Sequence, residues 1–294
     1  MLSNSRRIIY LLRGNYKMIS ERYQCQLSSA ALKKAVEELN EPEDNEVRLA
    51  AIDKLRTRFQ EEIKDFELIR TDDSFLLRFL RHRKFNEDKA LKSLENYHRH
   101  RKTWKSVFNL VDNPEKIDEF LSVGSVVPLK ERAKDGTFVN IGRPGFNFGK
   151  KDGILQFMAA TILSTEKLLE NEEMQIYGVT VIEELKDFGI GLSLQMTTVG
   201  MQFMNLMQDG MPIRIKSLNV FNESLAYDLI YACVRPFIKE KLRNRLQLHG
   251  NSHEKLHEMI DPENLPPFLG GSGPELDIEW WKEQLLQTNN NAEK

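Results

Sequence analysis

The sequence predicts an α/β domain with a mostly parallel sheet, preceded by a small subdomain of three helices. Two observations support this fold class. Between residues 47 and 104, three helical patterns follow one another in about 60 residues. After Asn113-Pro114, β-branched runs alternate with helical segments, the order expected of a parallel sheet with helical crossovers. A chain of 294 residues is long enough for both parts.

Helical periodicity and capping residues define the three N-terminal helices. In residues 47–66, apolar and charged residues alternate at the helical period. The second helix falls within residues 71–85, where Thr71 or Asp72 is a suitable N-cap. Asn86 can cap the third helix. These helices follow one another closely, so we expect them to pack as one unit.

Strands and helices alternate through the second domain. The turn signal Lys134-Asp135-Gly136 separates the first two expected strands. Val and Ile dominate the third strand, as is typical of a buried strand. In chain order we expect strands at 122–128 and 137–143, a helix at 152–171, a strand at 176–184, a helix at 195–208, a strand at 212–221, a helix from 225 and a short strand at 246–249.

The composition of the chain divides it into four parts. The acidic, proline-containing segment at 40–46 is typical of a linker, so we expect the residues before the first strong helical pattern to be flexible. Pro266-Pro267 and Gly270-Gly271 precede a last helix. The predicted parts are a flexible N-terminal extension (1–46), the three-helix subdomain (47–105), the α/β domain (113–273) and a C-terminal helix and tail (274–294).

The overall composition restricts the classes of partner. With a formal net charge of -2, the chain has no overall attraction to nucleic acid, so any recognition of anions must be local. No apolar run approaches the ~20 residues that span a bilayer, so we expect no transmembrane segment and only peripheral membrane contact. Cys25 and Cys233 lie far apart and indicate no disulfide framework; we expect Cys233 to be a small buried thiol. We expect a cytoplasmic monomer.

The stretch from residue 212 to 250 joins an apolar helix to basic residues on either side. Arg214 and Lys216 are two apart on an expected strand and therefore project from one face. Lys241 and Arg245 are four apart, the spacing that aligns side chains on a helix. Two basic pairs thus flank a segment that carries almost no charge.

The apolar helix carries one stripe at near-helical spacing. Two interpretations of the stripe stay open. In one, the helix buries it against a core, as most such helices do. In the other, the helix covers a removable hydrophobic guest while the flanking cations hold an anionic lipid. The members of the stripe are Tyr227, Ile230, Tyr231, Val234 and Ile238.

Catalytic and metal-binding signatures are absent from the sequence. It contains no G-x-S-x-G nucleophile elbow, Walker loop or G-x-G-x-x-G phosphate loop. We therefore expect no enzyme and no catalytic residues, although an α/β hydrolase stays a competing class. Three histidines, His249, His253 and His257, are spaced four apart. A Gly-Asn pair interrupts their run and no cysteine or carboxylate completes a ligand set, so we expect no metal and no cofactor.

Four motifs resemble, in order, those of one family. They read DSFLLRFLRHRKF, RIKSLNVFNES, RPFIKEKLRNRLQLHG and LPPFLGG. Together they resemble the CRAL-TRIO lipid-transfer proteins, and within that family the branch that contains the α-tocopherol transfer protein, clavesin and the cellular retinaldehyde-binding protein. The resemblance covers residues 47–273. It implies a CRAL-TRIO lipid-binding domain whose cavity holds one lipophilic molecule under a mobile helical lid, which we call the gate.

The resemblance also implies two sets of site residues. The first is a cationic patch that binds the headgroup of phosphatidylinositol bisphosphates, and the second is the wall of the lipid pocket. The patch corresponds to Arg83, Arg214, Lys216, Lys241 and Arg245. The gate corresponds to Tyr227, Ile230, Tyr231, Cys233, Val234 and Ile238, and the other pocket walls to Met158, Thr161, Thr165, Phe203, Leu206 and Met207.

Two details stay open at this point. Arg78 and Arg81 either contact lipid or pair with acidic residues of the neighbouring domain. After the third strand, relatives usually present an Asp and a Gly, whereas this chain has Glu184, Lys186 and Asp187. The identity of the ligand is therefore open, and a tocopherol assignment does not follow.

The function expected from these features is lipid carriage. A closed apolar cavity removes a hydrophobic molecule from water, and burial contributes about 25 cal/mol per Å² of apolar area. We expect a carrier of a small lipophilic molecule, tocopherol-like, retinoid-like or another hydrophobic lipid, that delivers it to endosomal or other phosphoinositide-containing membranes. The alternative is a phosphoinositide-recruited trafficking adaptor that transfers no cargo.

Overall fold

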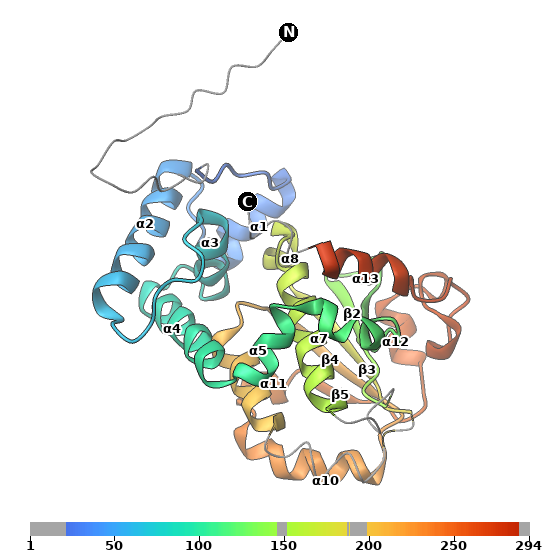
Figure 1. Cartoon of the computed structure of the whole chain (residues 1–294). Helices are drawn as coiled ribbons and strands as arrows, with labels where there is room; N and C mark the ends of the chain where they lie inside the picture. The colour runs from blue at the N-terminus through green and yellow to red at the C-terminus, as the bar shows by residue number, and fades with distance from the viewer. Residues whose placement is uncertain (1–21, 146–151, 187, 189–198, 288–294) are drawn as a thin grey trace.

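The computed structural model describes residues 22–145, 152–186, 188 and 199–287. Helices α1 to α4 lie on one side of the molecule, and a sheet with its covering helices lies on the other (Figure 1). The sheet is mostly parallel and its strands alternate with helices along the chain, which confirms the predicted fold class. Within the described ranges, no helix is both long and apolar enough to cross a membrane.

The three predicted N-terminal helices form where their caps place them. Asp72 accepts a hydrogen bond from the backbone N–H of Phe75 at 2.9 Å, and Asn86 accepts one from that of Lys89 at 3.0 Å. Both predicted N-caps are therefore confirmed. The helices are α2 (Asn45–Glu62), α3 (Asp73–His82) and α4 (Glu87–Thr103).

A further helix precedes them, so the prediction of a flexible extension is wrong for residues 22–46. Helix α1 (Ser29–Leu39) begins after Ser28, whose side chain accepts a hydrogen bond from the N–H of Ala31. Ala31, Ala35 and Leu39 are fully buried. The charge and proline of residues 40–46 are typical of a linker, but the small apolar residues before them recur four apart and pack on another helix.

The described residues include five strands, which form one sheet in the order β1-β2-β3-β4-β5. The first pair is antiparallel and the other three pairings are parallel. The third strand begins later than predicted, because Gly178 has a φ of 83° and separates it from helix α8 (Glu172–Tyr177). The strands are β1 (Val126–Pro128), β2 (Phe138–Gly142), β3 (Val179–Glu184), β4 (Ile215–Phe221) and β5 (Leu246–Leu248).

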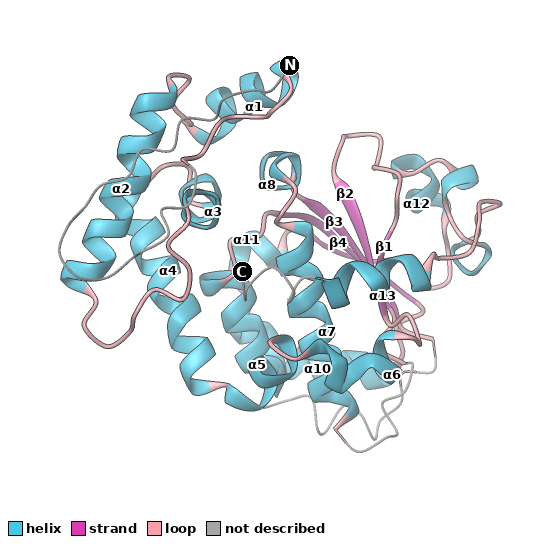
Figure 2. Cartoon of the chain, turned by 45° about the horizontal axis from the view of Figure 1, so that its top comes forward, coloured by secondary structure: helices cyan, strands magenta, loops and turns pink. Residues whose placement is uncertain are grey.

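Helices cover both faces of this sheet, and each face has its own core (Figure 2). On one face, helix α7 (Gly153–Leu168) joins the large core that continues into the N-terminal helices. On the other, helix α12 (Glu254–Met259) packs over Ile182 and Phe221. The remaining segments are α5 (Lys105–Val111), η1 (Pro114–Ile117), α6 (Asp118–Leu121), η4 (Pro262–Asn264), η5 (Pro267–Leu269) and α13 (Ile278–Gln287).

The apolar helix of the sequence lies at the edge of the domain as α10 (Leu225–Val234). It passes into a short turn, η3 (Arg235–Phe237), and then α11 (Glu240–Arg243). Of the helix predicted at 195–208, residues 195–198 lie outside the described residues. Residues 199–205 are helical and continue into a π-helical turn, η2 (Leu206–Gly210).

Candidate functional site

The inner side of α10 packs against the end of the sheet. Val234 belongs to a small cluster with Leu185, Phe188 and Val220, and Tyr227 and Ile238 pack against it. The rings of Tyr227 and Tyr231 stack with their centroids 6.0 Å apart. The predicted stripe therefore faces the domain at these positions; the side chain of Ile230 lies outside the described residues.

The outer side of α10 is apolar as well. Leu225 is 79% exposed, Leu229 is 57% exposed and Phe237, just beyond the helix, is 49% exposed. Cys233 is also exposed, so the prediction of a buried thiol is wrong. The sequence already indicated an apolar outer side, because this helix carries almost no charge on the side opposite its stripe either. A helix that is apolar all round is normally buried, so this surface is suited to contact with another apolar phase.

The other predicted wall residues divide between α7 and the segment before β4. Met158 and Thr165 are buried, and Thr161 is half-buried. The hydroxyls of Thr161 and Thr165 donate to the backbone oxygens four residues earlier, at 2.9 and 2.8 Å, so both hydroxyls are satisfied within α7. Among the others, Phe203 is half-buried and Leu206 and Met207 are buried.

The predicted basic patch is assembled from three elements that are distant in sequence. His82, at the end of α3, lies beside it: burial and then three cations, Arg83, Lys241 and Arg214, lower its pKa well below the ordinary value. Burial, followed by the charge of Arg245, likewise lowers the pKa of Lys241. Mutual repulsion of this kind requires proximity, so these cations lie close together. Lys216 also belongs to this group. Burial, and then the charge of Arg214, lowers the pKa of Lys216.

Backbone carbonyls hold the guanidinium groups of the patch. One nitrogen of Arg83 donates to the backbone oxygens of Gln208 and Asp209, both at 3.2 Å. Arg214 donates to the backbone oxygen of Ile176, and Arg245 to that of Ile215. These bonds fix the side chains without neutralising them. Within the described part of the chain, no carboxylate forms an ion pair with Arg83, Lys241 or Arg245.

Family models match both parts of the architecture. Residues 123–271 match the model of the CRAL/TRIO domain, and residues 51–96 match that of the CRAL/TRIO N-terminal domain. The chain belongs to the CRAL-TRIO family of lipid-binding proteins. The first match covers the sheet, α7 and the gate, and the second covers most of α2, α3 and α4.

Several known proteins are similar to this CRAL-TRIO chain. Human alpha-tocopherol transfer protein-like is 35% identical over 277 residues, which cover 92% of this chain and 79% of that protein. Human clavesin-2 is 31% identical over 284 residues, which cover 90% of this chain and 80% of that protein. The crystal structure of Sfh5 superposes with a TM-score of 0.49 at 13% identity, over 85% of this chain and 99% of that one.

Among the described residues, the carboxylate of Glu38 forms ion pairs with members of the basic patch. Glu38 on α1 lies 3.3 Å from a guanidinium nitrogen of Arg214 and 3.5 Å from the ammonium of Lys216. It also accepts a hydrogen bond from Lys34 at 2.5 Å. That bond, together with the charge of Lys216, lowers the pKa of Glu38 to about 2 despite partial burial. Sequence reasoning missed this anion because it lies in the segment that was predicted to be flexible.

Arg78 and Arg81 pair with acidic residues, which confirms one of the two interpretations left open. Arg78 lies 3.3 Å from Glu166 on α7. Arg81 donates to Glu41 at 2.8 and 2.9 Å and to Glu172 on α8 at 3.0 Å. Both arginines are buried. Their role is to join the N-terminal helices to the CRAL-TRIO domain.

The three histidines near β5 pack on an aromatic ring. His249 stacks on Phe221 with centroids 4.6 Å apart, and His253 lies on the same ring at 5.4 Å. His249 also bonds the side chain of Asn219 at 3.1 Å. His253 in turn stacks on His257 at 6.4 Å. These contacts account for the histidines as part of the packing under α12.

A pocket of about 610 Å³ opens at the carboxyl ends of β3 and β4. It contains none of the predicted wall residues and has charged groups in its lining. We therefore assign no lipid to it. Its described lining consists of Glu184, Leu185, Lys186, Phe188, Asn222, Ser224 and Phe268.

Proposed function

We propose that this CRAL-TRIO protein carries one lipophilic molecule under α10 and transfers it to membranes that contain phosphatidylinositol bisphosphates. The observation that carries the proposal is the position of α10, a helix apolar on both sides, next to a patch of clustered cations. The names of its relatives support carriage, since one of them is described as transfer protein-like. No catalytic role is needed to explain either feature.

The two sides of α10 suit the two states of such a carrier. In water, Tyr227 and Val234 cover the cargo, while Leu225 and Leu229 stay exposed. At a bilayer, the exposed leucines gain an apolar environment, which favours contact with the membrane by about 25 cal/mol per Å² buried. The gate can then move away from the domain, because the apolar groups that it uncovers meet lipid instead of water.

The basic patch selects the membranes at which the gate opens. An inositol phosphate headgroup offers several oxygens to the guanidinium and ammonium groups, and such charge-assisted hydrogen bonds are stronger than neutral ones. Lys241 and Arg245 follow the gate directly in sequence. A headgroup that binds the open gate better than the closed one shifts the equilibrium toward release.

The double variant Lys241→Ala, Arg245→Ala tests this proposal. We expect about tenfold slower transfer to vesicles with phosphatidylinositol bisphosphate, which corresponds to about 1.4 kcal/mol. The amount of copurified lipid, measured by native mass spectrometry, should not change. Lys255→Ala, Lys282→Ala is the matched control, because it removes the same charge from α12 and α13.

Two results would contradict the proposal. Equal transfer rates for both double variants would show that the patch is an ordinary solvated surface. Protein that binds phosphoinositide vesicles but never contains an extractable lipid would instead favour the trafficking adaptor.

A further inference from the structure

Three histidines lie next to the start of the gate. His249, which follows β5 directly, stacks on the ring of Phe221 at the end of β4. His253 lies against the same ring, and His257 of α12 stacks on His253 in turn. Phe221 is fully buried, and α10 begins at Leu225 in the same segment. The imidazoles thus pack on the segment of chain that leads from the sheet into the gate.

Residues 249–252, which we call the clasp, hold that segment by hydrogen bonds. The backbone N–H of Asn222 donates to the backbone oxygen of Gly250 at 2.7 Å. In return, the N–H of Gly250 donates to both carboxylate oxygens of Glu223, at 2.9 and 3.0 Å. Both bonded residues lie between β4 and α10. His249 is the first residue of the clasp, so a shift of its ring changes the attachment of the gate.

The ring of His253, immediately after the clasp, is packed for its neutral form. Its Nε2 atom is buried and has no hydrogen-bond partner among the described residues. Gly270 closes the other side, since a Cβ atom there would lie 2.9 Å from Nδ1. A neutral imidazole carries one N–H group, whereas the protonated ring carries two. Protonation of His253 therefore creates a buried donor without an acceptor, which is unfavourable.

The environment of both rings favours their neutral forms as well. Burial, and then the neighbouring His257, lowers the pKa of His253. Burial, and then Lys255 of α12, lowers the pKa of His249. A carboxylate acts on each ring in the opposite direction, but burial outweighs both carboxylates. The described ionisable groups that act on the two rings are Glu184, Glu223, Lys255 and His257.

Acid destabilises the clasp for this reason. Each imidazole has an ordinary pKa of 6.5 in the unfolded chain and a lower pKa in the folded protein. Between these two values the unfolded chain binds more protons, so the stability that the clasp has above pH 6.5 is lost as the pH falls. Movement of the clasp away from Phe221 lets the rings reach water and bind protons.

We propose that the clasp is a pH-sensitive restraint on the gate, which loosens in mild acid and lets the cargo leave. Two imidazolium rings on one phenyl ring repel each other, and the new N–H of His253 reaches water only when the clasp moves. Asn222 and Glu223 then lose their bonds to Gly250, and α10 can turn outward at its first residue. The proposal rests on the carrier function and adds a condition for release to it.

Release of lipid at different pH values tests the proposal. The protein with its copurified lipid is mixed with phosphatidylcholine vesicles, which lack the anionic headgroup, and the lipid that stays bound is measured over time by native mass spectrometry. We expect release to be about tenfold faster at about pH 5.5 than at about pH 7.5. One histidine that titrates at its ordinary pKa of 6.5 only in the loosened clasp favours that state by this factor.

His253→Phe is the decisive variant, because phenylalanine keeps the stacked ring but cannot bind a proton. The Nε2 atom has no described partner that the substitution would remove. Release from this variant should be as slow in acid as at neutral pH. The matched control is His100→Phe on α4, where burial also lowers the pKa of the imidazole. It should retain the pH dependence of the wild type.

Hydrogen exchange in the clasp separates this proposal from the carrier function. After correction for the intrinsic effect of pH, the N–H groups of Asn222 and Gly250 should exchange faster in acid in the wild type but not in His253→Phe. Lipid release that is equal at both pH values, or that depends on pH equally in wild type and His253→Phe, overturns the proposal and leaves the carrier function in place. Purified protein without any lipid would contradict the carrier function, and equal exchange at both pH values would then still overturn the role of the clasp.

Discussion

Two buried ionisable side chains, one at the junction of the two domains and one on β3 beside the gate, differ in their hydrogen-bond partners. At the junction, Arg81 is fully buried, and its guanidinium donates to Glu41, Glu172, Gln175 and the hydroxyl of Tyr23. Glu183 lies on β3 next to Val220, which packs against the gate, and it has no hydrogen bond or ion pair among the described residues. A buried charge that is satisfied within the protein holds the architecture together. Without such a partner, burial raises the pKa of Glu183 to about 7.

The basic patch lies between these extremes. Its arginines donate to backbone carbonyls, which position them but leave their charge in place. Of the described carboxylates, Glu38 reaches Arg214 and Lys216. The patch is therefore ordered before any headgroup arrives, and its free charge favours anions.

The largest effect is expected at the junction. Arg81→Met leaves the carboxylate of Glu41, which is 1% exposed, with one fewer cation. Removal of one partner of a buried pair costs about 3–5 kcal/mol of the free energy of unfolding, to be measured by urea denaturation. Arg58→Met is the control: Arg58 pairs with exposed carboxylates, so its replacement should change the free energy of unfolding far less. Similar losses of stability in both variants would show that the buried ion pairs at the junction contribute no more than exposed ion pairs.

Glu183 should make the free energy of unfolding depend on pH with a sign opposite to that of an ordinary carboxylate. Its folded pKa is raised from 4.5 to about 7, so between these values the folded state binds more protons than the unfolded state. The free energy of unfolding therefore falls as pH rises through this window and levels off above it, by up to about 3 kcal/mol in total. The groups that face Glu183 do not titrate here, because Gly142 and Val220 are uncharged and Tyr227 stays neutral.

Glu183→Gln should abolish this dependence. The measurement is the difference in free energy of unfolding between wild type and variant, taken from urea titrations at several values between pH 4.5 and 8. A difference that stays constant across this range would show that Glu183 is ionised like an ordinary exposed carboxylate and would weaken its contrast with Arg81.

The two sides of α10 should respond differently to the same substitution. Val234→Asp places a carboxylate on the inner side of α10, where its desolvation is unfavourable, and should reduce the amount of copurified lipid at least tenfold. Leu229→Asp changes the exposed side, so it should leave retention unchanged and slow transfer to vesicles. Native mass spectrometry measures the first quantity and a vesicle transfer assay the second. Equal loss of cargo in both variants would remove the distinction between the inner and outer sides.

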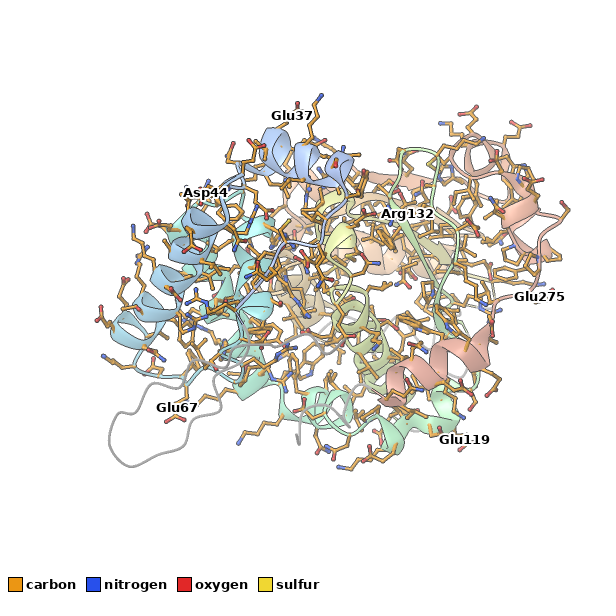
Figure 3. All side chains as sticks on the ribbon, turned by 90° about the horizontal axis from the view of Figure 1, so that it is seen from above. Glu37, Asp44, Glu67, Glu119, Arg132 and Glu275 are labelled. Carbon is orange, nitrogen blue, oxygen red and sulfur yellow. The ribbon has the colours of Figure 1, made fainter. Side chains whose placement is uncertain are left out.

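The smallest effect is expected on α1. Glu38→Gln removes an anion that competes with the headgroup for Arg214 and Lys216, so binding to phosphoinositide vesicles should tighten about threefold, within the range of partly exposed ion pairs. Added salt should reduce the difference. Glu37→Gln is the matched control, because Glu37 lies at the outer edge of α1 (Figure 3) and pairs only weakly with Lys33, at 3.8 Å. An equal gain in both variants would indicate a general charge effect.

Local patterns predicted most of the fold. Asp72 and Asn86 cap helices where the sequence placed them, because a capping side chain bonds backbone groups only two or three residues away. The order of strands and helices predicted the mostly parallel sheet for a similar reason. Failures arose where packing overrode composition: α1 follows its buried alanines despite the acidic linker beside it, and Cys233 is exposed although its helix is apolar.

The sequence by itself determined the secondary structure, the CRAL-TRIO family and the residue types at the gate and the patch, because periodicity and motifs relate residues that are close along the chain. Only the tertiary structure decided which charges meet. Glu38 lies 176 residues from Arg214, and no local pattern indicates that they form an ion pair. Glu183 has the same residue type as the adjacent Glu184, yet the alternation of β3 directs one toward the gate and the other toward a hydrogen-bonded pocket.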